Sequence, residues 1–359
     1  MSDLQISLLI IGAVVIGGIY LFNWFQERQL RRKLGQAFDG ERDDVLLKET
    51  APGAVKVEPQ MRDAAELEAA ARPTPEPQSR APELPAAPGF DETIDFIGAI
   101  DAETPIASAV VDELLGRIAA CGTPSRSVGL NESTDAWEAL EHNAGNAYAH
   151  LRLALQLANR SGPVSAAQLM SFCEAIRIAA ERAGARARLA DTEAALAAAR
   201  QLDAFCAEVD IAIGINIVAR DGESFNGTRI RAHVEAAGFK LEPSGVFHYR
   251  NDQRQTLFTL DNHEPAPFLP EQIKSLNTRG LTLLLDVPRV ENGVAVLRRM
   301  FEVGKGLALA LGGRMVDDNR VPLNEAGITK ISQQVAGIQE TMQSRGVSAG
   351  SERALRLFS

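Results

Sequence analysis

The sequence is poor in the residues that build metal sites, disulfide frameworks and aromatic cores. It has three cysteines, five histidines and 5% aromatic residues in 359 positions. Cys121, Cys173 and Cys206 form no CxxC pair and have no histidine at the spacing of a zinc site. We therefore interpret them as small core residues of a protein in a reducing compartment, and we expect neither a structural zinc nor a disulfide.

Catalytic motifs are also missing. Nothing in the chain resembles HExxH, GxSxG or a Walker A loop, and the five histidines are scattered. The acidic pair Asp317 and Asp318, followed by Asn319 and Arg320, is typical of a tight hairpin rather than of a metal site. The sequence thus predicts a protein without catalytic residues, cofactor or metal.

The overall charge excludes one further class of partner. The formal net charge is −10, whereas binding to nucleic acid requires a basic surface that faces the phosphates. We therefore expect no nucleic-acid partner.

A long apolar run stands at the N-terminus. Residues 4–25 carry no charge, and as a helix they would be about 33 Å long, enough to cross a bilayer core of about 30 Å. A cleaved secretory signal is the alternative, but it would have positive charge before the run and a small-x-small site after it. Here the cations follow the run, in a basic juxtamembrane segment at 26–40. This predicts a single transmembrane helix with the N-terminus outside the cytoplasm and residues 26–359 inside it.

The next segment differs in composition. Residues 41–89 hold eight of the seventeen prolines and no aromatic residue. Such a stretch cannot bury enough apolar surface to offset its conformational entropy. We interpret it as a disordered acidic linker that tethers the remainder to the bilayer.

The remainder shows two similar patterns. Leucines alternate at 151, 153, 155 and 157, and apolar residues alternate in the same phase from Leu281 to Val287. Each run indicates a strand with one buried face, and a helix-period segment follows each. The patterns predict tandem α+β domains of split βαβ type at 90–207 and 208–342, with antiparallel sheets covered by helices on one face, and a flexible tail at 343–359.

The second of these domains resembles the C-terminal domain of the ZipA family of bacterial cell division proteins. The resemblance rests on FNGTRIRAHVEAAGFKLEPSGVFHYR, LFTLDNHEPAPFLPEQ, GLTLLLDVP and LALALGGRMVDDNRVPL. It implies a non-enzymatic anchor at the septum of the bacterial inner membrane, with its N-terminus in the periplasm. In this family an open sheet face forms a shallow apolar cleft for the C-terminal peptide of FtsZ. Three positions depart from the family pattern: Leu284 replaces an aromatic residue, and Gly245 and His263 stand where methionines are expected.

Strand alternation agrees with this surface. If Leu283 faces the helices, then Thr282 and Leu284 face outward, beside outward positions on the strand at 211–218. The residues expected to contact the peptide are Gly214, Asn216, Val218, Phe247, Asn262, His263, Thr282 and Leu284. Two alternatives remain: the two domains bury this face against each other, or the chain is a membrane-tethered scaffold for another partner. A membrane-bound enzyme is a more distant third.

Overall fold

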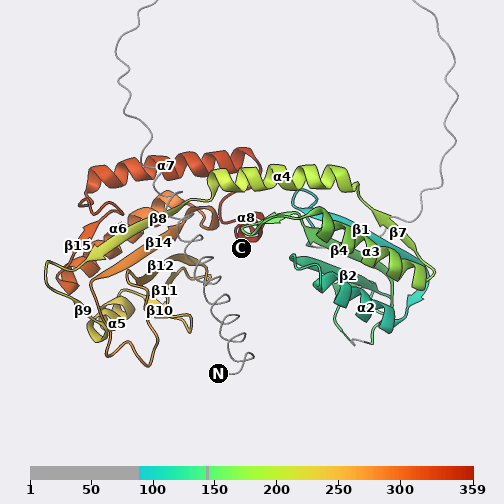
Figure 1. Ribbon diagram of the computed structural model, residues 1–359, viewed down its shortest axis with the longest axis horizontal. Coiled ribbons are helices and arrows are strands. Elements are labelled where there is room, and N and C mark those ends of the chain that lie inside the picture. Colours follow the sequence, from blue (N-terminus) through green and yellow to red (C-terminus); the bar gives the residue numbers. More distant parts are fainter. Residues whose placement is uncertain (1–88, 143–144) are drawn as a thin grey trace, which may run out of the picture.

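The computed structural model describes residues 89–142 and 145–359 (Figure 1). The predicted transmembrane helix at 4–25, the juxtamembrane segment at 26–40 and all but the last residue of the linker at 41–89 lie outside the described residues. Within the described ranges, no helix combines the length and the apolar character needed to cross a bilayer.

In its described residues, the N-terminal domain, 91–209, has a five-stranded antiparallel sheet, a two-stranded hairpin and three helices. Its elements are β1 (Asp95–Ile106), α2 (Ser108–Ala119), β2 (Ser125–Asn131), β3 (Ala136–Ala139), β4 (Tyr148–Gln156), β5 (Ala158–Asn159), β6 (Gly162–Pro163), α3 (Ala166–Arg182), β7 (Arg186–Leu189) and α4 (Thr192–Val209). The strand order is β3-β2-β4-β1-β7, and β5 and β6 form a small separate hairpin.

The C-terminal domain, residues 210–344, is built in the same way. Its elements are β8 (Ala212–Val218), β9 (Phe225–Asn226), α5 (Gly227–Ala236), β10 (Phe239–Leu241), β11 (Phe247–Arg250), β12 (Thr256–Asn262), β13 (Asn277–Thr278), β14 (Gly280–Asp286), the 3-10 turn η1 (Val287–Arg289), α6 (Gly293–Leu311), β15 (Arg314–Val316) and α7 (Glu325–Ser344). The main sheet has the order β10-β11-β12-β14-β8-β15.

Both sheets contain the same four-strand arrangement. The two sets are β7-β1-β4-β2 and β15-β8-β14-β12. If the four strands of each set are numbered along the chain, both have the order 4-1-3-2, which is that of a split βαβ unit. All the pairings are antiparallel. The prediction of α+β domains with antiparallel sheets is therefore confirmed. The additional edge strands differ, because β3 follows β2 in the chain whereas β10 and β11 precede β12.

Equivalent leucines lie in the two cores. Leu153 on β4 pairs with Gly98, and Leu283 on β14 pairs with Ile215. Both leucines are completely buried. The three cysteines are buried as predicted for core residues, and burial raises the pKa of the Cys206 thiol to about 11.

Local signals mark several helix ends. Ser165 and Gln168 form a capping box at the start of α3, and the Asp191 and Asn324 side chains accept backbone hydrogen bonds at the starts of α4 and α7. Helix α6 ends at Gly312, which adopts the left-handed conformation (φ 78°) that a side chain would disfavour. Figure 1 shows α4 and α7 lying along the same side of the molecule, above both sheets.

The prediction of a flexible tail at 343–359 is wrong. After α7 the chain forms a further helix, α8 (Glu352–Leu357), whose Ala354 and Leu357 are completely buried, as is Phe358 after it. These side chains complete a third apolar cluster between the domains. Its buried members are Ile94, Ala158, Phe205, Cys206 and Val209 from the N-terminal domain, and Met342, Val347, Ala354, Leu357 and Phe358 from the C-terminal end of the chain. Burial of this apolar surface holds the chain end in place.

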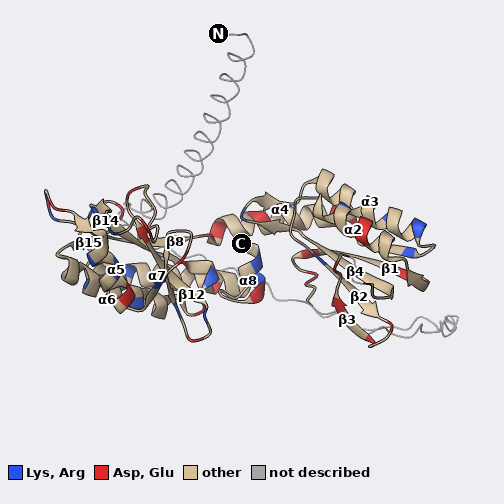
Figure 2. Cartoon of the chain, turned by 90° about the horizontal axis from the view of Figure 1, so that it is seen from below, with Lys and Arg blue, Asp and Glu red and all other residues tan. Residues whose placement is uncertain are grey.

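Charged groups reinforce the contact that α8 makes with the N-terminal domain. Arg356 donates to the carboxylate of Asp95, a side chain with 0% exposure, and Arg353 pairs in the same way with Asp91. Gln156 donates to the carbonyl oxygen of Arg356 at 3.0 Å. Figure 2 shows acidic and basic residues side by side on α8. A buried carboxylate without its cation would be costly, so these pairs make the orientation of α8 specific.

A further arginine links the domains directly. Arg160, in the hairpin between β5 and β6, binds Asp210 and Asp286, each at 2.7 Å. Its guanidinium carbon also lies 5.8 Å from the centre of the Phe358 ring. One side chain thus bridges the N-terminal domain, strand β14 and the chain end.

We expect the substitution Phe358→Ala to destabilise both domains together. Removing a fully buried phenylalanine ring typically costs about 3–5 kcal/mol, and here the ring belongs to the cluster that joins the domains. Thermal unfolding of the purified full chain should be cooperative in the wild type and should begin at a clearly lower temperature in the variant.

Leu309→Ala is the matched control, because Leu309 is 86% exposed. An unchanged melting curve for Phe358→Ala would show that the cluster does not join the domains.

Candidate functional site

The C-terminal sheet has one face toward its helices and one face away from them. Leu283 lies against Gly304 of α6, and its cross-strand partners Leu260 and Ile215 are also fully buried. Alternation places the intervening residues on the opposite face. We call this the outer face, and its central row is Thr259, Leu284 and Gly214, which are direct partners on β12, β14 and β8.

The next row of the outer face is polar. Asp261, Thr282 and Asn216 are direct partners on the same three strands. The Thr282 hydroxyl donates to Asn216 Oδ1 at 2.7 Å, and Asn216 Nδ2 donates to Asp318 Oδ1 at 2.8 Å. His263 Nδ1 lies 3.2 Å from the Thr282 hydroxyl at the other end. A hydrogen-bonded line therefore crosses the sheet beside Leu284.

Asp318 belongs to a hairpin at the border of this face. The hairpin follows β15 and is closed by the Asp317 N–H, which donates to the Val321 carbonyl, and by Arg320 in the left-handed conformation (φ 63°). A side chain at Gly214 would place its Cβ 3.2 Å from Asp318 Oδ1. Glycine at 214 thus lets the hairpin lie close to β8.

Two charged groups on the outer face have altered pKa values. Burial raises the pKa of the Asp261 carboxyl, although the hydrogen bond from the Asn262 N–H acts in the opposite direction. Burial lowers the pKa of His248, next to Thr259 on the neighbouring strand, although the Glu242 carboxylate 3.3 Å away acts against this. Both groups are thus in a less polar environment than an ordinary surface position.

The structure brings four of the eight predicted contact residues together. Gly214, Asn216, Thr282 and Leu284 are neighbours on the outer face. Asn216 is only 4% exposed, because the Asp318 hairpin covers it. Val218 at the end of β8 and His263 just after β12 lie on the same face, one on each side of Gly280, and His263 also contacts Thr282.

Two predicted contact residues, Phe247 and Asn262, do not lie on the outer face. Phe247 is completely buried on the helix side, where its ring centre lies 5.4 Å from that of Phe268. Asn262 is also buried: it donates to the Ala266 carbonyl at 2.6 Å and accepts from the Thr278 hydroxyl at 2.6 Å. Phe247 therefore serves the core, and Asn262 holds the loop between β12 and β14.

The prediction missed His248, Thr259, Asp261 and Asp318. The first three could have been found by alternation, because Phe258 and Leu260 are core residues and Phe247 pairs with Leu260. Asp318 could not have been found in this way, since its position depends on a contact between β8 and a distant hairpin.

A departure from the family pattern also has a physical cause. Gly245 has a positive φ of 85°, and a Cβ there would lie 2.6 Å from the Cβ of Pro267. The turn before β11 in this chain therefore requires glycine, and a methionine could not occupy the position without moving the loop.

This arrangement is suited to docking rather than to catalysis. Leu284 provides an apolar centre, and Asp261, Asp318 and His248 surround it with polar groups, which is the anatomy of a binding patch. Within residues 89–142 and 145–359, no group of three or more His, Cys, Asp or Glu residues could hold a metal ion.

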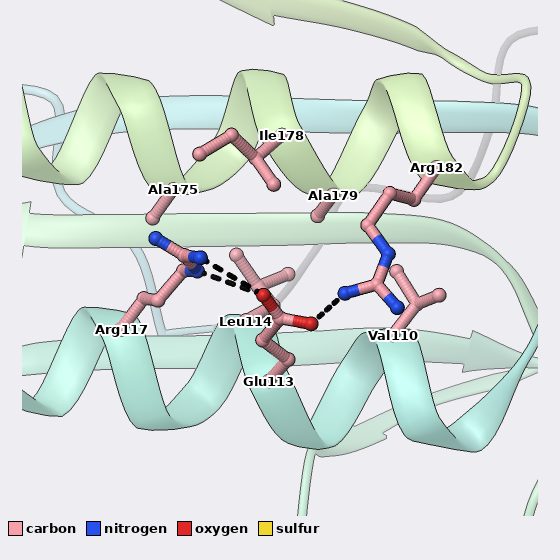
Figure 3. Close-up of a pocket in the computed structure, with 8 residues that line it drawn as sticks. All are labelled: Val110, Glu113, Leu114, Arg117, Ala175, Ile178, Ala179 and Arg182. Atoms are coloured by element: carbon pink, nitrogen blue, oxygen red, sulfur yellow. Dashed lines mark hydrogen bonds and ion pairs between the residues drawn. The ribbon is translucent and has the colours of Figure 1, made fainter.

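The N-terminal domain has a groove of its own. It has a volume of about 700 Å³ and lies between α2 and the free end of β2. Its apolar lining is Phe90, Leu115, Ile118, Val128 and Leu140, and Arg126 lies at its rim. By contrast, the seam between α2 and α3 is closely packed (Figure 3). Glu113 of α2 pairs across it with Arg182 of α3, and also with Arg117 one turn along α2.

The C-terminal domain matches a known family. Residues 211–334 match the family model described as ZipA, C-terminal FtsZ-binding domain. This range begins just before β8 and ends within α7. The predicted resemblance to ZipA is therefore confirmed.

Individual relatives are distant. Cell division protein ZipA of Marinobacter nauticus is 25% identical over 135 residues, which are 36% of this chain and 40% of that protein. Those of Shewanella loihica and Ectopseudomonas mendocina are 28% identical over 110 residues and 26% over 139 residues. The matched parts cover 30% and 38% of this chain, and 33% and 51% of those two relatives. The chain thus spans about a third to a half of the length of the relatives it matches.

We expect Asp261→Asn to stabilise the protein near neutral pH. The raised pKa means that the folded state retains the Asp261 proton more strongly than the unfolded chain, whose pKa is near 3.8. Stability is therefore lost as the pH rises through the folded-state pKa, where the carboxylate becomes charged. An asparagine does not titrate and avoids this loss.

Melting temperatures of the wild type and the variant, measured from pH 3 to pH 8, test this. The advantage of the variant should appear above the folded-state pKa and vanish below about pH 3.8. A variant that is less stable than the wild type at pH 7 would contradict it.

Proposed function

We propose that the outer face of the C-terminal domain binds the C-terminal peptide of FtsZ, and that the chain fastens FtsZ polymers to the inner membrane at the septum. The central row Thr259, Leu284 and Gly214 carries the proposal, since it lies away from the helices in the segment that matches the FtsZ-binding family model. The division role itself is consistent with the relatives, each of which is a cell division protein.

The proposed activity is non-enzymatic. The outer face offers an apolar centre, hydroxyl and amide side chains, and carboxylates. Such groups can hold a peptide without changing it chemically. Specificity would come from the side chains that fit around Leu284.

The first test of the peptide site is a pair of neighbouring substitutions on β14. Burying a leucine side chain gains about 1.5–3 kcal/mol, so Leu284→Asp should weaken binding of the FtsZ peptide by at least about tenfold. Leu283→Asp should instead unfold the domain, because Leu283 is completely buried against α6. Peptide titration and thermal melting of both variants separate the two effects.

If Leu284→Asp lowers the melting temperature as severely as Leu283→Asp, the outer face is covered in solution and docking there is excluded. If Leu284→Asp keeps both its stability and its full affinity, the peptide binds elsewhere.

The membrane part of the proposal rests on residues 4–33. The uncharged run at 4–25 is followed by Arg28, Arg31, Arg32 and Lys33, an order that retains the C-terminal side in the cytoplasm. A phosphatase reporter fused after residue 40, active only in the periplasm, should therefore be silent, and a fluorescent reporter that folds only in the cytoplasm should be active.

Neutral replacement of the four cations should produce a mixture of orientations, whereas neutral replacement of Lys240, far along the chain, should not. A fusion after residue 40 that is active in the periplasm would refute the topology.

A second function is favoured by the groove of the N-terminal domain. The chain would then be a membrane-tethered scaffold for another cytoplasmic partner, with the FtsZ-binding surface lost. The groove lies outside the family match, between α2 and β2. This alternative predicts that the wild-type chain does not bind the FtsZ peptide. Under the first proposal the chain binds it, and Leu115→Glu in the groove leaves that binding unchanged, so the two functions can be separated.

A further inference from the structure

The outer face contains a carboxylate whose charge is not compensated. Asp261 is half-buried, and its Oδ1 accepts the N–H of Asn262 at 2.7 Å. Among the described residues, no lysine, arginine or histidine forms an ion pair with it. A carboxylate of this kind costs stability in the isolated protein, because water is partly removed and no cation replaces it.

The position of Asp261 relates it directly to the apolar centre. On β12, Thr259 and Asp261 are two residues apart. Thr259 is the direct partner of Leu284 on β14, and Asp261 is the direct partner of Thr282. Diagonal neighbours of this kind are about 7–8 Å apart. That distance is close to the spacing of about 6.8 Å between side chains on one face of an extended segment. A segment with an apolar side chain on Leu284 would therefore bring its next side chain on that face to Asp261.

The surrounding charges make the strip beside Leu284 acidic. Asp318 lies at the opposite end of the same row, where its carboxylate accepts the amide of Asn216. The histidines that face this region are His263, next to Thr282, and His248, next to Thr259, where Glu242 lies beside it. A positively charged side chain is thus the complementary group for this strip.

We propose that Asp261 determines the specificity of the outer face by pairing with a lysine or arginine of the bound peptide, two residues from the apolar side chain that covers Leu284. The proposal deepens the proposed function and rests on it. Docking would exclude more water from the carboxylate, and a cation at this point would turn an unfavourable group into a charge-assisted hydrogen bond. A peptide without the cation would leave Asp261 buried and unpaired, and the face would reject it.

The experiment measures binding of two probes to the full chain in detergent micelles. The first probe is the C-terminal peptide of FtsZ from the same organism, and the second is that peptide with every lysine and arginine replaced by glutamine. The protein variants are Asp261→Asn, which removes the charge, and Asp252→Asn, which makes the same change at an exposed turn position between β11 and β12.

We expect Asp261→Asn to weaken binding of the natural peptide by about tenfold and to leave binding of the glutamine peptide unchanged or stronger. Added salt should weaken binding of the natural peptide to the wild type more than to this variant. Asp252→Asn should behave as the wild type with both probes. Melting curves of both variants show that the fold is retained.

If Asp261→Asn binds both peptides as the wild type does, the specificity role is refuted while the docking site stands, provided that Leu284→Asp loses binding. If the wild type binds neither peptide, or if Leu284→Asp binds as well as the wild type, the proposed function fails and this inference fails with it.

Discussion

The two-residue period of strand β14 determines both the core and the candidate site. Leu281, Leu283 and Leu285 are completely buried on one side, and Thr282 and Leu284 lie on the other. A shift of pairing by one residue would exchange these sets and bury the polar ones. The register of this strand therefore determines both the stability of the domain and the composition of its outer face. A change of register would alter both at once.

A second constraint joins the domains. Arg160 is held by carboxylates of Asp210 and Asp286, and Phe358 fills the space beside it. Because the apolar cluster receives side chains from both domains, the N-terminal domain becomes part of the support for the C-terminal sheet. This gives residues 91–209 a structural role, whatever their groove binds.

Periodicity predicted most of the fold but not its long-range contacts. The alternation around Leu153 and Leu283 correctly indicated strands, because a half-buried strand depends only on its own pattern. The prediction of Phe247 as a contact residue was wrong, because Phe247 and Tyr249 alternate with His248 and Arg250 as core residues do. The helix at the chain end could not be predicted from the sequence. A helix as short as α8 is stabilised by distant partners such as Asp95 and Phe205.

The composition of the outer face limits how it can bind. Leucine stands at 284, where the resemblance implies an aromatic ring, and glycine at 214 adds no side chain beside it, because a Cβ there would lie 3.2 Å from Asp318 Oδ1. Apolar contact alone is therefore modest, and polar complementarity has to supply the discrimination. A half-buried carboxylate costs the free protein stability, and that cost is recovered only with a cationic partner. Stability and selectivity thus oppose each other at Asp261, as is common at functional sites.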